Sequence, residues 1–178
     1  MIRLCVYVIL LSLVTACHRT PVTGVRIHVD GLMENDTAVS IITQDSVYTA
    51  YLDGNKGAVL AIDREQKADY AIFRYHGISI PGYIEPGKDL EIFLKIENWE
   101  IEVKFAGTGA PKNEYLNNKT LRGFYPDYKT DEAGIIQSLK AWELRLSGIL
   151  DSMHFESFFT NRERERIHYL VYGCLPRY

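Results

Sequence analysis

Two stretches of the sequence have the residue types and spacing of known chemical sites. The first is Gly107-x-Gly109, which follows an alternating segment and precedes a predicted helix, as the Gly-x-Gly-x-x-Gly loop of dinucleotide-binding proteins does. Lys112 stands where the third glycine is needed, and the preceding segments alternate as antiparallel strands do. We therefore expect a tight turn, with Gly107 and Gly109 in unusual φ and Pro111 just before the helix.

The second stretch is Glu165-x-x-His168, the spacing of carboxylate–histidine metal sites in helix bundles. Such sites need a second copy of the motif and further inward carboxylates, and the sequence offers neither. A solvated helix face with a Glu163–Arg166 pair is the better interpretation. No Gly-x-Ser-x-Gly elbow is present, and His28 and His76 are expected at surface positions of strands or turns. We predict no catalytic residue, no metal site and no cofactor.

The chain has three cysteines, Cys5, Cys17 and Cys174. They form no Cys-x-x-Cys pair and no cluster with zinc spacing, which excludes dithiol chemistry and a zinc site. Cys174 lies on the apolar stripe of a predicted helix, where a cysteine is usually a small buried apolar residue. A regulatory thiol is the alternative for this position.

The N-terminal residues have the organisation of a secretory signal. One basic residue precedes the apolar run Leu4–Val14, and the small residues Thr15 and Ala16 precede Cys17. The run is shorter than the roughly 20 apolar residues that a membrane-spanning helix needs. We therefore predict that residues 1–16 are a signal peptide and that residues 17–24 are a tether.

Val14-Thr15-Ala16-Cys17 resembles the bacterial lipobox. The resemblance implies cleavage between Ala16 and Cys17 and acylation of Cys17, so that the mature chain is anchored in a membrane. His18 follows in place of Asp, which by analogy with Gram-negative sorting favours the outer membrane, with the protein facing the periplasm. The alternative is an ordinary signal peptide with an incidental cysteine.

Composition and alternation predict a mainly β domain. Aromatic residues are abundant, with 12 Tyr and 7 Phe, and a net charge of −3 argues against nucleic acid as a partner. Short alternating segments separated by turns predict an antiparallel β-sandwich or open barrel over residues 25–109. Within it, Asp53–Gly57 is expected to be a hairpin loop. The residues expected to face inward are Val25, Ile27, Val29, Val39, Ile41, Leu90, Ile92, Leu94, Ile96, Ile101, Val103 and Phe105.

Residues 110–178 are predicted to be helical, which makes the fold α+β overall. We expect a short helix over 113–125 ended by Pro126, and a second helix capped by Thr130. The apolar seam of the second helix is Ile135, Leu139, Trp142, Leu146, Ile149 and Met153.

Thr160-x-x-Glu163 has the pattern of a capping box that opens a last helix. The apolar stripe of this helix is Ile167, Leu170, Val171 and Cys174. Because little sequence follows to pack on the stripe, we expect Ile167, Leu170 and Val171 to be poorly covered and to form a surface for a protein partner.

Two phrases of the sequence carry a family resemblance: YIEPGKDLEIFL (Tyr83–Leu94) and VKFAGTGAPKNEYLNN (Val103–Asn118). They resemble the N-terminal β-domain, of unknown function, of Gram-negative thioredoxin-like (thiol:disulfide interchange) lipoproteins. The resemblance extends over residues 25–118 and implies a lipoprotein adaptor or docking module. In that family the chemistry lies in a C-terminal thioredoxin module with Trp-Cys-x-x-Cys. Trp99 and Trp142 have no neighbouring cysteine, so no catalytic residue is implied here.

Three functions remain open from the sequence. The first is a non-catalytic, lipid-anchored adaptor, and the second is the N-terminal part of an oxidoreductase whose thioredoxin domain lies beyond residue 178. The third is a glycan- or peptide-binding lipoprotein with an aromatic binding face. The candidate residues for that face are Tyr48, Tyr51, Tyr70, Tyr75, Tyr83 and Trp99.

Overall fold

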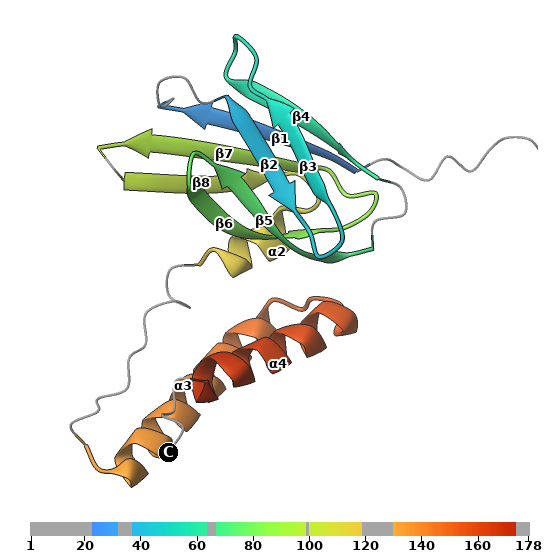
Figure 1. Ribbon diagram of the computed structural model, residues 1–178. Coiled ribbons are helices and arrows are strands. Elements are labelled where there is room, and N and C mark those ends of the chain that lie inside the picture. The colour runs from blue at the N-terminus through green and yellow to red at the C-terminus, as the bar shows by residue number, and fades with distance from the viewer. Residues whose placement is uncertain (1–22, 32–36, 64–66, 99, 119–129, 174–178) are drawn as a thin grey trace, which may run out of the picture. The chain divides into compact units, whose positions relative to one another are not determined.

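The computed structural model describes residues 23–31, 37–63, 67–98, 100–118 and 130–173 (Figure 1). The chain divides into two compact units, Met1–Asn113 and Glu114–Tyr178. The predicted signal and lipidation positions Cys5, Ala16 and Cys17 lie outside the described residues, as do Trp99, Pro126 and Cys174.

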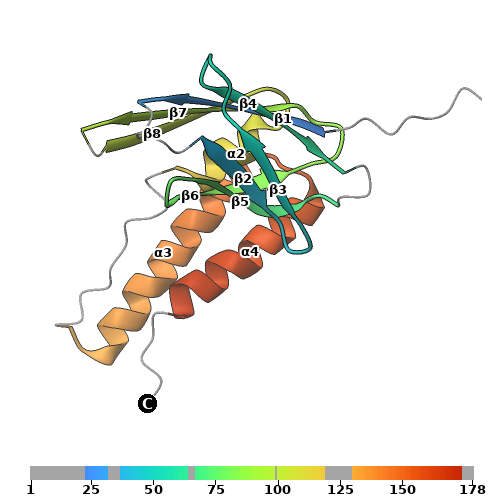
Figure 2. The same ribbon diagram turned by 45° about the horizontal axis from the view of Figure 1, so that its top comes forward.

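The first unit contains eight strands in two four-stranded sheets. The strands are β1 (Thr23–Asp30), β2 (Ala38–Ile42), β3 (Val47–Tyr51), β4 (Gly57–Ile62), β5 (Asp69–Tyr75), β6 (Ile78–Ile84), β7 (Leu90–Glu97) and β8 (Glu100–Ala106). The sheet orders are β4-β1-β7-β8 and β3-β2-β5-β6. The two sheets form separate layers, seen from a second direction in Figure 2. The predicted β-sandwich is therefore confirmed.

All paired strands run antiparallel except β1 and β7, the two central strands of the first sheet, which are parallel. Their register places Arg26 beside Glu91, His28 beside Phe93 and Asp30 beside Lys95. This pairing joins segments that lie far apart in the sequence.

The core lies between the sheets and follows from the period-two alternation of the strands. Most of the predicted inward residues are buried: Val25, Ile27, Val29, Val39, Ile41, Leu90, Ile92, Leu94 and Phe105. Ile96 and Val103 are half-buried and pack against this core. Ile101 is 41% exposed, because it lies near the start of the edge strand β8.

The predicted hairpin around Asp53–Gly57 is wrong in its topology. A tight turn is present, with Asp53 N–H donating to Gly57 O at 2.8 Å and Lys56 N–H donating to Asp53 O at 2.9 Å. The two flanking strands nevertheless belong to different sheets, since β3 pairs with β2 and β4 pairs with β1. The turn carries the chain from one layer to the other, so both strands direct their apolar side chains to the same core from opposite sides.

Three helices follow the strands among the described residues: α2 (Ala110–Leu116), α3 (Glu132–Ser152) and α4 (Ser157–Tyr172). The first begins three residues before the predicted start, and Pro111 lies inside its first turn, where a missing N–H removes no helical hydrogen bond. No helix among these residues has the length and apolar character needed to cross a membrane. The fold is mainly β and α+β overall, as predicted.

The helix caps differ from those predicted. Asp131, not Thr130, caps α3, because its carboxylate accepts a hydrogen bond from Gly134 N–H at 3.0 Å. α4 begins at Ser157 after Glu156, so Thr160 and Glu163 lie inside the helix and form no capping box. The seam of α3 is also shifted at its end, since Leu150 is buried while Met153 is 41% exposed.

Candidate functional site: the outer face of the first sheet

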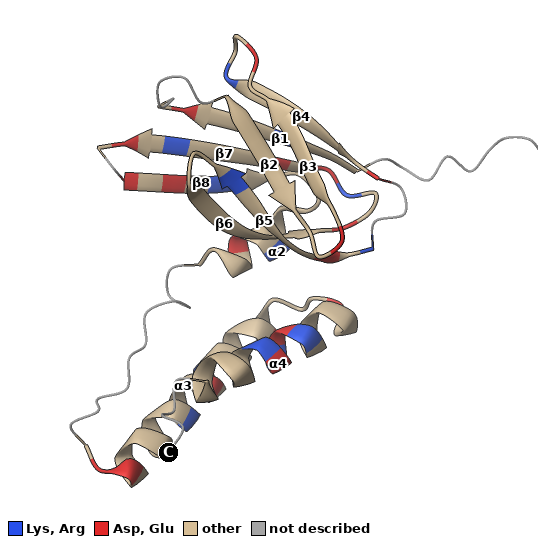
Figure 3. Cartoon of the chain, viewed as in Figure 1, with Lys and Arg blue, Asp and Glu red and all other residues tan. Residues whose placement is uncertain are grey.

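The outer face of the first sheet carries an ordered arrangement of charged and aromatic side chains. Every second residue of β1 and β7 points away from the core, because side chains alternate along a strand. Figure 3 shows charged residues along β1, β7 and β8, whereas β2 and β3 carry none. The outward residues in the middle of this face are Val59 and Gly57 on β4, Arg26, His28 and Asp30 on β1, Glu91, Phe93 and Lys95 on β7, and Glu102, Lys104 and Ala106 on β8; the register adds Gly24 and Ala61 at one end of the face and Glu97 and Glu100 at the other.

The strand register arranges these residues in three rows across the sheet. The first row is Val59, Arg26, Glu91 and Ala106; the second is Gly57, His28, Phe93 and Lys104; the third is Asp30, Lys95 and Glu102. In the first and third rows, opposite charges lie side by side on the two central strands. Such cross-strand pairs stabilise a sheet modestly.

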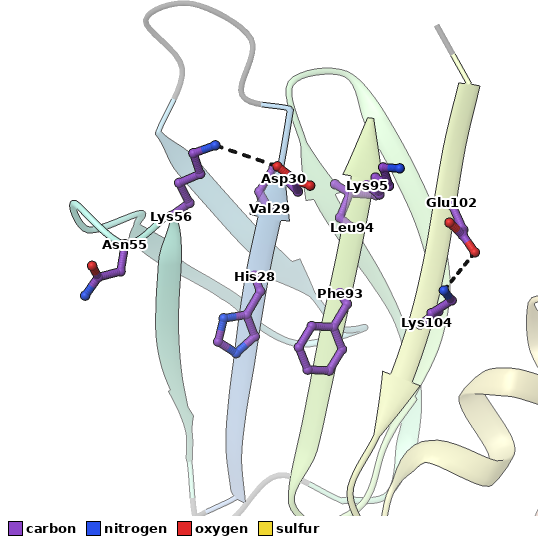
Figure 4. Close-up of a pocket in the computed structure, with 10 residues that line it drawn as sticks. All are labelled: His28, Val29, Asp30, Asn55, Lys56, Phe93, Leu94, Lys95, Glu102 and Lys104. Carbon is purple, nitrogen blue, oxygen red and sulfur yellow. Dashed lines mark ion pairs between the residues drawn. The ribbon is translucent and has the colours of Figure 1, made fainter. Parts of the chain in front are cut away.

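The middle row contains two stacked rings. The rings of His28 and Phe93 are 4.9 Å apart between centroids and nearly parallel, at 10°. Phe93 is 40% exposed, and Gly57 next to His28 carries no side chain. Figure 4 shows the two rings side by side on neighbouring strands. The centre of the face is therefore less polar than its surroundings.

Ion pairs surround this aromatic centre. Arg26 Nη1 lies 2.7 Å from Glu91 Oε1, Lys56 Nζ lies 3.7 Å from Asp30 Oδ1, and Lys104 Nζ lies 3.1 Å from Glu102 Oε1. The last two pairs border an open hollow of about 410 Å³ (Figure 4). Exposed pairs of this kind contribute only about 0–1 kcal/mol each to stability. These ion pairs therefore add little to the stability of the sheet, although they fix the charge pattern of its outer face.

The Gly-x-Gly stretch forms a tight turn that is hydrogen-bonded to Asp89. Gly107 has φ +90°, and Thr108 Oγ1 accepts from Asp89 N–H while Gly109 N–H donates to Asp89 O at 2.9 Å. A Cβ at Gly107 would lie 2.5 Å from Asp89 O, so glycine is required there. Gly109, contrary to expectation, is not in the positive-φ region.

Lys112, which stands at the third glycine position, is buried and bound to Glu85. Its ammonium forms an ion pair with the Glu85 carboxylate and lies 4.9 Å from the centroid of the Tyr83 ring. The side chain of Asn113 pairs with both backbone groups of Tyr83, accepting from its N–H at 2.8 Å and donating to its C=O at 2.9 Å. The two phrases that carry the family resemblance therefore meet in space.

The Glu163–Arg166 pair is present, but it does not lie on a solvated helix face. The Glu163 side chain is 0% exposed, and Arg166 donates to its two oxygens at 2.8 and 2.7 Å. Tyr115 is buried near this pair, and its ring makes edge contacts with Phe155 and Phe159. Burial, and secondly the Glu163 charge, raise the pKa of Tyr115 above its usual value.

The Glu165-x-x-His168 spacing forms no metal site. Glu165 is exposed, and His168 Nδ1 lies 3.1 Å from Glu143 Oε1 on α3. Tyr172 donates to the other oxygen of Glu143 at 2.9 Å, and this hydrogen bond raises the pKa of Tyr172. No group of three or more metal-ligating side chains occurs in the part of the chain that the structure describes. His168 and Tyr172 on α4 instead contact Glu143 on α3.

The last helix is better covered than expected. Ile167 and Val171 are 1% and 0% exposed, so only Leu170, at 39%, remains on the surface. The predicted exposure of the stripe is therefore wrong for two of its three described residues. The buried residues of α4 lie on one side of that helix, and the buried residues of α3 lie on one side of α3. The two helices pack together.

The described members of the predicted aromatic face do not form a common surface. Tyr75 and Tyr83 are 2% and 1% exposed, whereas Tyr51 is 73% exposed. Tyr48 is half-buried against the core, and the ring of Tyr70 makes an edge contact with that of Tyr83. Sheet aromatics here mainly fill space between elements, while the aromatic centre of the outer face, His28–Phe93, was not singled out from the sequence. The sequence pattern that could have indicated this aromatic centre is the opposite order of charges in Arg26-x-His28-x-Asp30 and Glu91-x-Phe93-x-Lys95.

The comparisons with known proteins assign no family. No family model and no curated protein matches the chain. It is similar to the NMR structure of a protein from Eubacterium rectale, with 17% identity and a TM-score of 0.33 over 49% of this chain and 91% of that one. It is also similar to the crystal structure of a "putative cell adhesion protein" from Bacteroides uniformis ATCC 8492, with 12% identity and a TM-score of 0.28 over 49% of this chain and 50% of that one. Neither likeness assigns a function to this chain.

Proposed function

We propose that this protein is a lipid-anchored cell-envelope protein whose β-sandwich is a non-catalytic docking module. The observation that carries the proposal is the order of an apolar run, Val14-Thr15-Ala16 and Cys17 at the N-terminus. Acylation of Cys17 would hold the chain at a membrane surface, which we take to be the periplasmic face of a bacterial outer membrane.

The position of the first strand supports this arrangement. β1 begins at Thr23, six residues after Cys17. A fully extended chain of that length spans roughly 20 Å. The sandwich would therefore stay close to the bilayer, where contact with other envelope proteins does not require a long search in solution.

The anchor is tested by metabolic labelling with a palmitate analogue in a Gram-negative host. The natural chain should incorporate the label and fractionate with membranes, and Cys17→Ser should lose the label because the thiol that carries the diacylglycerol is gone. Cys174→Ser is the matched control and should label as the natural chain does. Unchanged labelling and fractionation of Cys17→Ser would show that the anchor proposal is wrong.

A second candidate is that the chain is the N-terminal part of a thioredoxin-like oxidoreductase lipoprotein. The observation that favours it is the contact between the two sequence segments that carry the family resemblance. Asn113 binds the backbone of Tyr83, and Lys112 binds Glu85. Genomic DNA beyond codon 178 distinguishes the candidates. An in-frame Trp-Cys-x-x-Cys would support the oxidoreductase, and an immediate stop codon would remove it.

A further inference from the structure

The outer face of the first sheet carries opposite charges at matching positions of its two central strands. Arg26 on β1 lies beside Glu91 on β7, and Asp30 on β1 lies beside Lys95 on β7. The order along β1 is positive, aromatic, negative, and along β7 it is negative, aromatic, positive. Each strand therefore has the charge pattern that complements the other.

This pattern makes the face complementary to a second copy of itself. A two-fold axis parallel to the strands and midway between β1 and β7 would place β1 of one copy over β7 of the other at the same row. Arg26 would then face Glu91, and Asp30 would face Lys95, in both directions, as an isologous interface requires. We propose that this face is a self-association surface, through which two copies of the chain form a symmetric dimer.

The middle row fits the same operation. His28 of each copy would face Phe93 of the other, so the two stacked ring pairs would form the centre of the interface. Lys104 on β8 would lie over Gly57 on β4, which has no side chain to obstruct it. A long side chain thus meets an empty position on the partner.

The edges of the face extend the charge match. Lys56 lies next to Asp30 on one side of the sheet, and Glu102 lies next to Lys95 on the other. The two-fold operation brings Lys56 of one copy to Glu102 of its mate. Arg26 can bind Glu91 within its own chain and across the interface at once, because a guanidinium has five N–H donors.

The size of the face predicts a weak dimer. Four strands about 4.8 Å apart and about seven residues long give roughly 450 Å² of sheet per copy, which is below the size of a stable interface. The contacts are largely ionic and exposed, so they should weaken as salt screens them. The charged rim and the aromatic centre provide specificity for a second copy rather than high affinity.

Sedimentation equilibrium of residues 17–178 carrying Cys17→Ser tests the proposal. This chain contains every described residue and lacks the acylation site, so the outcome does not depend on the anchor. The average mass should equal that of a monomer at about 10 µM and approach twice that value near 1 mM, as expected of a weak interface. Adding ~0.5 M NaCl should return the protein to monomer.

Two charge reversals give the decisive comparison. Arg26→Glu and Glu91→Arg should each weaken dimerisation by about tenfold or more, because like charges then face each other across the interface. A mixture of the two variants should dimerise again, because Glu at position 26 then faces Arg at position 91. Arg74→Glu, at an exposed position on β5 of the other sheet, is the matched control and should dimerise as the parent does.

Several outcomes would overturn the proposal. A monomer at 1 mM, including one that binds a different protein through this face, excludes self-association. A dimer that neither reversal weakens, or a mixture that fails to restore association, excludes this face as its interface. Far-ultraviolet circular dichroism of each variant separates loss of association from loss of fold.

Discussion

Glu163 is a carboxylate with a fully buried side chain, and it is paired with Arg166 in the second unit. A buried charge is strongly unfavourable unless it is paired and hydrogen-bonded. Arg166 meets that need with two short hydrogen bonds, while its own side chain stays 41% exposed and partly hydrated. The spacing of three residues predicted the pair, but it could not show that this side of α4 is buried.

Replacing Glu163 by Gln should destabilise the helical unit. An amide cannot accept two hydrogen bonds from the Arg166 guanidinium in the same way, and it leaves buried polar groups without partners. We expect a loss of about 1–3 kcal/mol in the free energy of unfolding, measured by urea denaturation. Glu165→Gln, on the exposed side of the same helix, should change it by less than about 0.5 kcal/mol. Equal effects of the two variants would contradict the assigned burial.

Tyr115 makes the same cluster sensitive to alkaline pH. Burial and the Glu163 charge raise its pKa, so the folded chain keeps a proton that the unfolded chain loses above its ordinary pKa of about 10. Because the folded state then binds more protons, stability should fall as pH rises above about 10.

Urea midpoints at pH 8 and near pH 11 test this prediction. Tyr115→Phe should lose part of the alkaline destabilisation, since phenylalanine has no proton to release. Tyr51→Phe, at a position that is 73% exposed, should retain the full effect of pH. The same pH dependence in Tyr115→Phe as in the natural chain would exclude Tyr115 as its source.

The short helix α2 is held in place by side-chain contacts with Tyr83 and Glu85. Within the first unit, the side chain of Asn113 is completely buried and makes three hydrogen bonds, two to Tyr83 and one to Gly109 O at 2.8 Å. Lys112 adds the ion pair with Glu85. A helix of seven residues is too short to be stable by itself, so these tertiary contacts must hold it.

Asn113→Ala should therefore destabilise the sandwich by about 2–4 kcal/mol, because it leaves buried backbone groups of Tyr83 unpaired. Asn113→Asp should not restore stability, since a carboxylate accepts from Tyr83 N–H but cannot donate to the two carbonyls. Thermal unfolding of both variants, with the exposed Asn55→Ala as the control, provides the measurement. Full stability of Asn113→Asp would mean that only the accepted hydrogen bond matters.

The strands show the difference between local pattern and long-range pairing. Alternation located the strands and most of the inward residues, because it reflects the two faces of each strand. The hairpin expected at Asp53–Gly57 was wrong because turn chemistry does not determine which sheet each strand joins. The parallel pair β1–β7, which forms the rows of the candidate face, has no signal in either strand alone.

Taken as a whole, the molecule combines a proposed membrane anchor with a sandwich whose outer face is self-complementary. Anchoring in a bilayer would raise the local concentration of the chain, so that an association too weak to matter in dilute solution could be populated at a membrane. The two proposals are independent, since the dimer is tested on a chain without the acylation site.

The amino-acid sequence by itself was sufficient for the α+β fold class, the strand positions, the inward faces and the Glu163–Arg166 spacing. These features depend on local periodicity and residue chemistry. The burial of Glu163, the hydrogen bonds of Asn113 and the residue rows of the outer face became visible only in the folded chain. Arg26 and Glu91 are 65 residues apart in sequence and form an ion pair at 2.7 Å, because the core places β1 and β7 side by side.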